Sequence, residues 1–176
     1  MGDFWVFGYG SLMWNPGFEV LEKSPATLHG LHRSLCIHSW VHRGTQEKPG
    51  LVLGLNNGGS CKGMGLKAPG EKRTEIIDYL RARELVTDVY LECWREIRLD
   101  NGESAKALVY RVDRNHPQYA AGLTLDHQYE IVKTAVGKSG ANPDYVRQTV
   151  ACMHEAGISD RTLEYICKKL DEASDG

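Results

Sequence analysis

The spacing of apolar residues changes once along the chain, and that change limits the possible folds more than any other feature. Over roughly the first two thirds, short apolar runs of alternating polarity lie between glycine-rich turns, a pattern typical of β-strands. One helical segment interrupts them. From Leu125 onward, apolar residues recur every three or four positions, which is typical of amphipathic helices. Strands followed by helices predict an α+β domain rather than a doubly wound parallel sheet.

Strands are expected where apolar and polar side chains alternate, because successive side chains of a strand point to opposite faces. They fall at residues 5–7, 31–37, 51–55, 62–67, 89–99 and 105–112. We interpret Asn56-Asn57-Gly58-Gly59 as the turn that closes the strand before it. Asp100-Asn101-Gly102 is a strong signal for a tight hairpin between the last two strands.

Helices are expected at four places, which are 71–84, 125–136, 142–157 and a final segment from Ser159-Asp160 through Leu170. Gly137 is the expected C-cap of the second helix, since glycine adopts the left-handed conformation that ends many helices. Asn142 is the expected N-cap of the third helix, with Pro143 in its first turn.

The length of 176 residues fits a single domain spanning 1–176. The net charge of −2 favours neither nucleic acid nor an anionic membrane surface as a partner. No apolar run approaches the roughly 20 residues of a membrane-spanning helix, and the N-terminus lacks the features of a secretory signal. Five scattered cysteines without a Cys-x-x-Cys pair indicate reduced thiols, so we expect a cytoplasmic protein. His38 and His42 have a metal-like spacing without an obvious third ligand, and no metal is expected.

The segment Phe7-Gly8-Tyr9-Gly10-Ser11-Leu12 leaves an expected strand and turns at two glycines. Successive backbone N–H groups in such a turn can form an anion-binding concavity, although a tight turn around a buried Tyr9 explains the pattern equally well. The segment lacks the third glycine of a dinucleotide fingerprint, and its order differs from the Gly-x-Ser-x-Gly nucleophile elbow.

Three other side chains are candidates for function. Arg33 shares a strand face with apolar residues, so it needs a salt-bridge partner or an anionic ligand. Glu84 follows Ile76 and Leu80 at intervals of four, which places a carboxylate at the end of an apolar helical stripe. Desolvation there would raise its pKa, unless the helix frays or a neighbouring arginine pairs with it. Tyr145 lies in the first turn of an expected helix and fits either a site or the core.

Taken together and in order, these residues resemble the ChaC family of glutathione-specific γ-glutamylcyclotransferases. The resemblance runs from Trp5 to Tyr145 and is carried by Trp5-Val6-Phe7-Gly8-Tyr9-Gly10-Ser11-Leu12-Met13-Trp14, His42-Arg43-Gly44, Lys48-Pro49-Gly50, Tyr79-Leu80, Arg83-Glu84, Ser139-Gly140, Asn142 and Tyr145. The chain departs from some relatives at Leu85-Val86-Thr87-Asp88, where they have a pair of glycines.

The resemblance implies a small mixed β-barrel packed with helices. It also implies an enzyme that cleaves glutathione into 5-oxoproline and Cys-Gly without a metal or organic cofactor. Glu84 matches the family's catalytic glutamate. The substrate-binding residues implied are Gly8, Tyr9, Gly10, Ser11, Leu12, Met13, Arg33 and Tyr145.

Three other functions stay open at this point. A γ-glutamyl-amino-acid cyclotransferase would have the same fold and chemistry with a different substrate. A serine hydrolase would use Ser11 with a histidine. A non-catalytic module would keep a γ-glutamyl pocket and turn nothing over.

Overall fold

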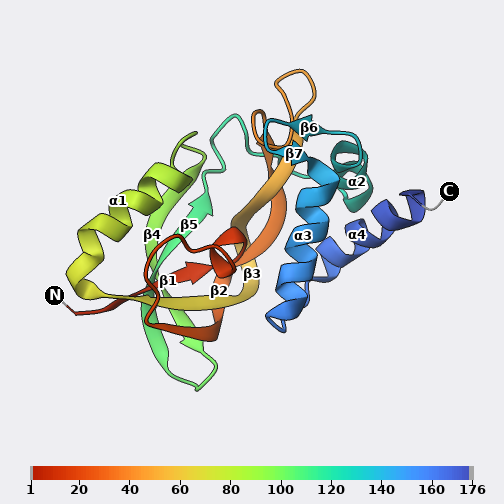
Figure 1. The fold of residues 1–176 in the computed structure, drawn as a ribbon. Helices are drawn as coiled ribbons and strands as arrows, with labels where there is room; N and C mark the ends of the chain where they lie inside the picture. Colours follow the sequence, from red (N-terminus) through yellow and green to blue (C-terminus); the bar gives the residue numbers. More distant parts are fainter. Residues whose placement is uncertain (1, 175–176) are drawn as a thin grey trace. The chain divides into compact units, whose positions relative to one another are not determined.

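A computed structural model describes residues 2–174, which fold into two compact units. The barrel unit contains residues 2–33 and 54–116, and the helical unit contains residues 34–53 and 117–174. Figure 1 shows the order of the elements along the chain, which is β1 (Phe4–Gly8), η1 (Ser11–Met13), β2 (Glu22–Ser39), β3 (Gly50–Ala68), η2 (Gly70–Lys72), α1 (Arg73–Glu84), β4 (Tyr90–Leu99), β5 (Ser104–Val112), α2 (Leu125–Val132), β6 (Val136–Gly137), β7 (Gly140–Ala141), α3 (Asn142–Glu155) and α4 (Arg161–Ser174).

Five strands close into a barrel in the order β1-β3-β2-β4-β5. The pairing is mixed, because β1 runs antiparallel to β3 and parallel to β5. A regular antiparallel ladder joins β4 to β5 from Tyr90↔Val112 to Arg98↔Ser104. Its turn has the expected Asp100-Asn101-Gly102 sequence, and Gly102 adopts a φ of 88° that favours glycine. The predicted α+β class with a small mixed barrel and helices is confirmed.

Helix α1 packs on the barrel unit through one apolar stripe. Ile76 and Leu80 are buried against a cluster from β1, β3 and β5 that includes Val6, Leu66 and Leu108. The opposite face of α1 is charged and exposed, as expected for a helix that covers a sheet from one side. This packing fixes the place of Glu84, which is the last residue of α1.

The predicted turn at Asn56-Asn57-Gly58-Gly59 is wrong, because β3 continues through it from Gly50 to Ala68. Gly58 and Gly59 have φ values of 93° and 66° inside the strand. Gly30 of the neighbouring β2 also has a positive φ, of 87°. Glycines within strands often mark bulges and bends, so the long strands bend here without ending.

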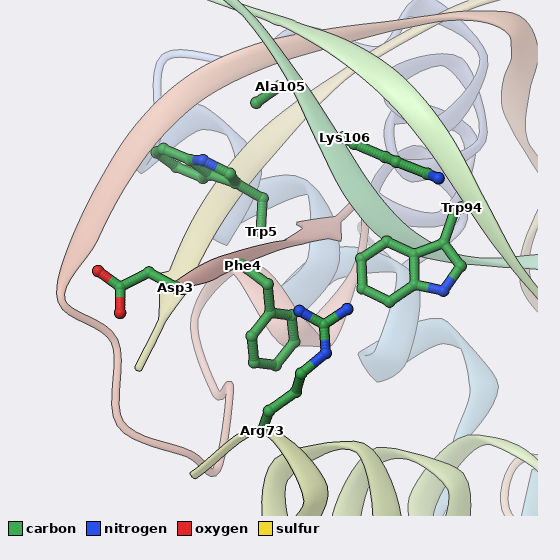
Figure 2. Close-up of a pocket in the computed structure, with 7 residues that line it drawn as sticks. All are labelled: Asp3, Phe4, Trp5, Arg73, Trp94, Ala105 and Lys106. Atoms are coloured by element: carbon green, nitrogen blue, oxygen red, sulfur yellow. The ribbon is translucent and has the colours of Figure 1, made fainter. Parts of the chain in front are cut away.

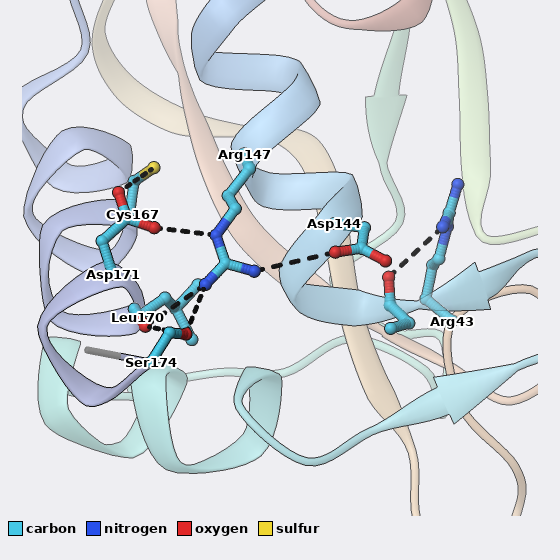
Figure 3. Close-up of polar contacts among 8 residues, drawn as sticks. Arg43, Asp144, Arg147, Cys167, Leu170, Asp171 and Ser174 are labelled. Atoms are coloured by element: carbon cyan, nitrogen blue, oxygen red, sulfur yellow. Dashed lines mark hydrogen bonds and ion pairs between the residues drawn. The ribbon is translucent and has the colours of Figure 1, made fainter. Parts of the chain in front are cut away.

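In the helical unit, α3 and α4 lie side by side and are tied together by Arg147 (Figure 3). Its guanidinium donates to Asp171 at 2.8 Å and to the Leu170 carbonyl at 3.2 Å, both on α4. Asp160 accepts a hydrogen bond from the Leu163 backbone N–H at 3.1 Å, so the predicted start of α4 at Ser159-Asp160 is confirmed.

The predicted C-cap at Gly137 and the predicted N-cap at Asn142 are both wrong, because each residue makes contacts with other parts of the chain instead. Helix α2 ends at Val132, and Gly137 pairs with Gly140 in the short β6–β7 hairpin. A side chain on Gly137 would overlap the backbone of Arg43 and Gly44, so glycine is needed there for close approach. Asn142 is fully buried and does not cap α3. Its side-chain amide exchanges hydrogen bonds of 2.7 and 2.8 Å with the backbone of Leu51.

Candidate functional site

Glu84 is the last residue of α1, and its side chain is 17% exposed. Burial disfavours the ionised form and raises the pKa of Glu84, while the charge of Arg83 opposes that rise. Arg83 Nε lies 3.4 Å from Glu84 Oε1. A carboxyl group with a raised pKa can both accept and return a proton near neutral pH, which is what general acid/base catalysis requires.

Arg83 binds the segment that follows β1. Its Nη2 donates to Ser11 Oγ at 2.8 Å, and its Nη1 donates to the Asn15 carbonyl at 2.7 Å and to the Tyr79 hydroxyl at 3.2 Å. Gly17 lies close by with a φ of 74°, and a side chain there would overlap the Tyr79 hydroxyl. The end of α1 and the turn at Ser11 are therefore joined through one guanidinium.

The predicted substrate loop begins where β1 ends at Gly8 and passes through Tyr9 and Gly10 into the short helix η1 of Ser11, Leu12 and Met13. Leu12 and Met13 are buried, and Ser11 is exposed. Within this turn, the N–H of Met13 donates to the Gly10 carbonyl at 2.9 Å. Ser11 and Leu12 begin the turn, and the first N–H groups of a helical turn have no partner within it. Their N–H groups are thus suited to hold a substrate oxygen.

Arg33 is 8% exposed and supports the same loop from β2. Its Nε donates to the Tyr9 carbonyl at 2.6 Å, and its Nη2 donates to the Lys62 carbonyl at 2.6 Å. The guanidinium therefore fixes the backbone of the loop. The expectation that Arg33 itself touches substrate stays a prediction.

A second ion pair lies next to Glu84 in the barrel unit. Arg81 of α1 donates to both oxygens of Glu92, at 2.8 and 2.9 Å, and Tyr110 donates to Glu92 Oε2 at 3.1 Å. Burial, followed by the negative charges of Glu92 and Glu84, raises the pKa of Tyr110, so its hydroxyl stays protonated as a donor. Sequence reasoning assigned no role to Glu92 or Tyr110, because their contact with α1 depends on the fold.

Tyr145, the remaining predicted site residue, lies in the first turn of α3 in the helical unit. Its hydroxyl accepts a hydrogen bond from the Leu53 backbone N–H at 3.0 Å. The Arg43 guanidinium lies 5.4 Å from the centre of its ring and donates to the Ala141 carbonyl at 3.3 Å. All the other predicted site residues, Gly8 to Met13, Arg33 and Glu84, lie in the barrel unit.

The hydrogen-bond partners of Ser11 and of two histidines bear on the serine hydrolase alternative. In the range 2–174, Arg83 is the side chain that hydrogen-bonds Ser11 Oγ, and no histidine does so. His42 hydrogen-bonds Ser139 at 2.8 Å, and burial lowers the pKa of His38. No group of three or more His, Cys, Asp or Glu side chains is placed to hold a metal ion within the described residues. None of the helices in the described range is long and apolar enough to span a membrane.

Comparisons with known proteins identify the family of this chain. The ChaC-like protein family matches residues 4–173. The glutathione-specific γ-glutamylcyclotransferase of Escherichia coli (strain K12) is 35% identical over 162 residues, which are 92% of this chain and 70% of that protein. The enzyme of the same name from Schizosaccharomyces pombe is 32% identical over 92% of this chain and 88% of its own length.

The fold has a close counterpart among solved structures. The crystal structure of a γ-glutamyl cyclotransferase specific to glutathione from yeast superposes with a TM-score of 0.86 and 20% identity, over 98% of this chain and 97% of that one. At this identity the superposition establishes the fold. The sequence match over nearly the whole length establishes the family, and the chain belongs to the ChaC-like proteins.

Proposed function

We propose that this chain is a glutathione-specific γ-glutamylcyclotransferase that cleaves glutathione into 5-oxoproline and Cys-Gly. The relatives from E. coli and S. pombe bear that name and align with 92% of the chain. The observation in this molecule that carries the proposal is the buried Glu84 carboxyl with its raised pKa. It lies next to Arg83, the residue that binds the turn at Ser11.

The proposed reaction needs one proton acceptor that later becomes a proton donor. The α-ammonium group of the γ-glutamyl unit first releases one proton to solvent. Its neutral amine nitrogen then attacks the γ-carbonyl carbon, and ionised Glu84 takes a second proton from that nitrogen. The five-membered ring closes, the amide bond to cysteine breaks, and Glu84 returns the proton to the departing amine. All bond changes lie within the substrate, so we expect no metal or organic cofactor.

The turn from Gly8 to Met13 would hold the substrate in a reactive shape. Because the attack is intramolecular, folding the γ-glutamyl group against itself supplies much of the rate. The N–H groups of Ser11 and Leu12 are suited to a substrate carboxylate or to the oxyanion that develops on the carbonyl oxygen. Arg33, which holds the Tyr9 carbonyl at 2.6 Å, would keep this backbone in place.

We further propose that both units serve one γ-glutamylcyclotransferase domain spanning 1–176, because the family match extends over residues of both. We also place the reaction in the cytoplasm, with a small-molecule substrate and neither nucleic acid nor membrane as a partner. The net charge of −2 and the five cysteines, none of them in a disulfide among the described residues, support this.

The direct test is incubation of the purified protein with reduced glutathione, followed by mass analysis of the products. Equal amounts of 5-oxoproline and Cys-Gly support the proposal. Release of free glutamate would indicate hydrolysis, and treatment with a fluorophosphonate would then show whether Ser11 is the nucleophile. Glutathione binding without turnover would indicate a binding module.

A further inference from the structure

A cavity of about 520 Å³ in the barrel unit lies outside the candidate active site (Figure 2). It is lined by Asp3, Phe4, Trp5, Arg73, Trp94, Ala105 and Lys106, and none of these is a predicted site residue. Its size is within the range of small-molecule pockets. Two indole rings, a guanidinium and an ammonium group dominate its chemistry.

The cavity and the candidate active site lie at opposite ends of α1. Arg73 is the first residue of that helix, and Glu84 is the last. With a rise of about 1.5 Å per residue, their backbones are roughly 16 Å apart along the helix axis. On β1 too, the cavity and the candidate site lie at opposite ends, because Phe4 begins the strand and Gly8 ends it. A ligand in this cavity would therefore not occupy the position of the γ-glutamyl substrate.

The guanidinium of Arg73 lies against two aromatic rings, Phe4 and Trp94, whose centres are 6.2 Å apart. Its central carbon lies 4.8 Å from the centre of the Phe4 ring and 4.9 Å from the centre of the Trp94 ring. Figure 2 shows the guanidinium beside both rings. Contacts of this kind attract the guanidinium through its positive charge and leave its N–H groups able to donate hydrogen bonds to another group. In residues 2–174, no carboxylate or carbonyl accepts a hydrogen bond from the Arg73 guanidinium, and the Arg73 backbone N–H donates to the Gly70 carbonyl.

The other charges around the cavity favour an anion. Lys106 contributes a second cation from β5. The one acidic residue in the lining, Asp3, accepts a hydrogen bond from the Gly70 backbone N–H at 3.1 Å, and its carboxylate points away from Arg73 in Figure 2. An immobilised guanidinium with an unused edge is well shaped for two parallel hydrogen bonds to a phosphate or carboxylate.

We propose that this cavity is a second ligand site, which binds a small organic oxyanion attached to a flat ring, as in a mononucleotide. Arg73 binds the oxyanion through the edge of its guanidinium, with Lys106 as the second cation. The flat ring stacks on the exposed indole surface of Trp5 or Trp94, since stacking on aromatic side chains accepts any planar ring. The site is independent of the γ-glutamyl chemistry proposed for Glu84.

Adenosine monophosphate is a suitable probe, with adenosine and inorganic phosphate as its two halves. Binding is measured by titration calorimetry and by quenching of tryptophan fluorescence. We expect the nucleotide to bind more tightly than either half. Arg73→Gln should weaken its binding by about tenfold or more, and Arg73→Lys should weaken it less, because lysine keeps the charge and loses the planar edge.

Arg161→Gln is the matched control, because Arg161 is the first residue of α4 as Arg73 is of α1, and binding should not change. Glutathione turnover by Arg73→Gln reports whether that variant is folded. Nucleotide binding that is equal in Arg73→Gln and the unchanged protein would overturn the proposal. So would competition between the nucleotide and glutathione, which would place the probe in the active site. An affinity for inorganic phosphate equal to the affinity for the nucleotide would overturn the requirement for a ring.

Discussion

The guanidinium of Arg83 lies 2.8 Å from Ser11 Oγ, across a sequence separation of 72 residues. The same guanidinium is 3.4 Å from the carboxylate of Glu84. The proposed acid/base and the proposed substrate loop are thus held by one side chain. Any change in Arg83 should alter the geometry of the loop and the charge near Glu84 together.

Arg83→Met should lower kcat/KM for glutathione by about 10- to 100-fold, because the turn at Ser11 loses its anchor. It should also shift the pH profile. The charge of Arg83 lowers the pKa of Glu84, so its removal raises that pKa further. Since ionised Glu84 is the proposed base, the acidic limb of kcat/KM should move to higher pH.

Arg81→Met is the control for that profile. Arg81 lies on the same helix but donates to Glu92, and its side chain is 51% exposed. Its removal should leave the acidic limb closer to its original position than Arg83→Met does. An acidic limb that does not move in Arg83→Met would contradict the assignment of that limb to Glu84.

Ser11→Ala should reduce kcat/KM by about 3- to 10-fold and leave the enzyme active. The change removes one hydrogen bond to Arg83, while the backbone N–H groups of the turn remain. Steady-state assays with glutathione measure this effect. Complete loss of activity with a trapped acyl-enzyme in the unchanged protein would instead support a serine nucleophile.

Much of the fold could be predicted from local pattern, because the responsible interactions are close in sequence. The β4–β5 hairpin follows from the Asp100-Asn101-Gly102 turn between alternating segments, and α1 follows from its apolar stripe. The role of Gly137 could not be predicted, because the backbone that it packs against belongs to Arg43 and Gly44, which are far away in sequence. Gly58 and Gly59 were misinterpreted because a bend within a long strand uses the same residues as a turn.

The candidate site could likewise be predicted from the sequence only in part. The position of Glu84 at the end of an apolar stripe could be predicted from a spacing of four residues. The importance of Arg83 could not, since its partners Ser11, Asn15 and Pro16 follow β1 and reach it only in the folded chain. Tyr110 and Glu92 were missed for the same reason, because strand pairing brings them next to α1.

Reduced glutathione should be preferred over γ-glutamyl-alanine by at least about tenfold in kcat/KM, the ratio that measures discrimination between substrates. We expect binding of the Cys-Gly portion, including its terminal carboxylate, to orient the γ-glutamyl group and so to raise the rate of ring closure. Assays of both substrates under the same conditions provide the comparison. Equal efficiency would leave the ring-closing chemistry in place and remove the glutathione preference.

The raised pKa of Glu84 predicts an effect on stability. Ionisation of the buried carboxyl opposes folding. The stabilising contribution of the protonated carboxyl is therefore fully present below the unfolded pKa of about 4.3 and is lost as pH rises through the folded pKa. Glu84→Gln, which cannot ionise, should therefore have the higher Tm at about pH 8, with a smaller difference at about pH 4. Thermal unfolding of both proteins at the two pH values measures this. A Tm difference that does not depend on pH would contradict the raised pKa.

Glutathione turnover by Glu84→Gln tests the central claim most directly. Glutamine keeps the shape of the side chain but cannot exchange the proton, so release of 5-oxoproline should fall by about 100-fold or more. Asp78→Asn is the matched control, because Asp78 lies on the same helix with a side chain that is 68% exposed, and it should retain nearly full activity. Far-UV circular dichroism establishes that both variants are folded. A folded Glu84→Gln protein that releases 5-oxoproline at a rate close to that of the unchanged enzyme would contradict the account.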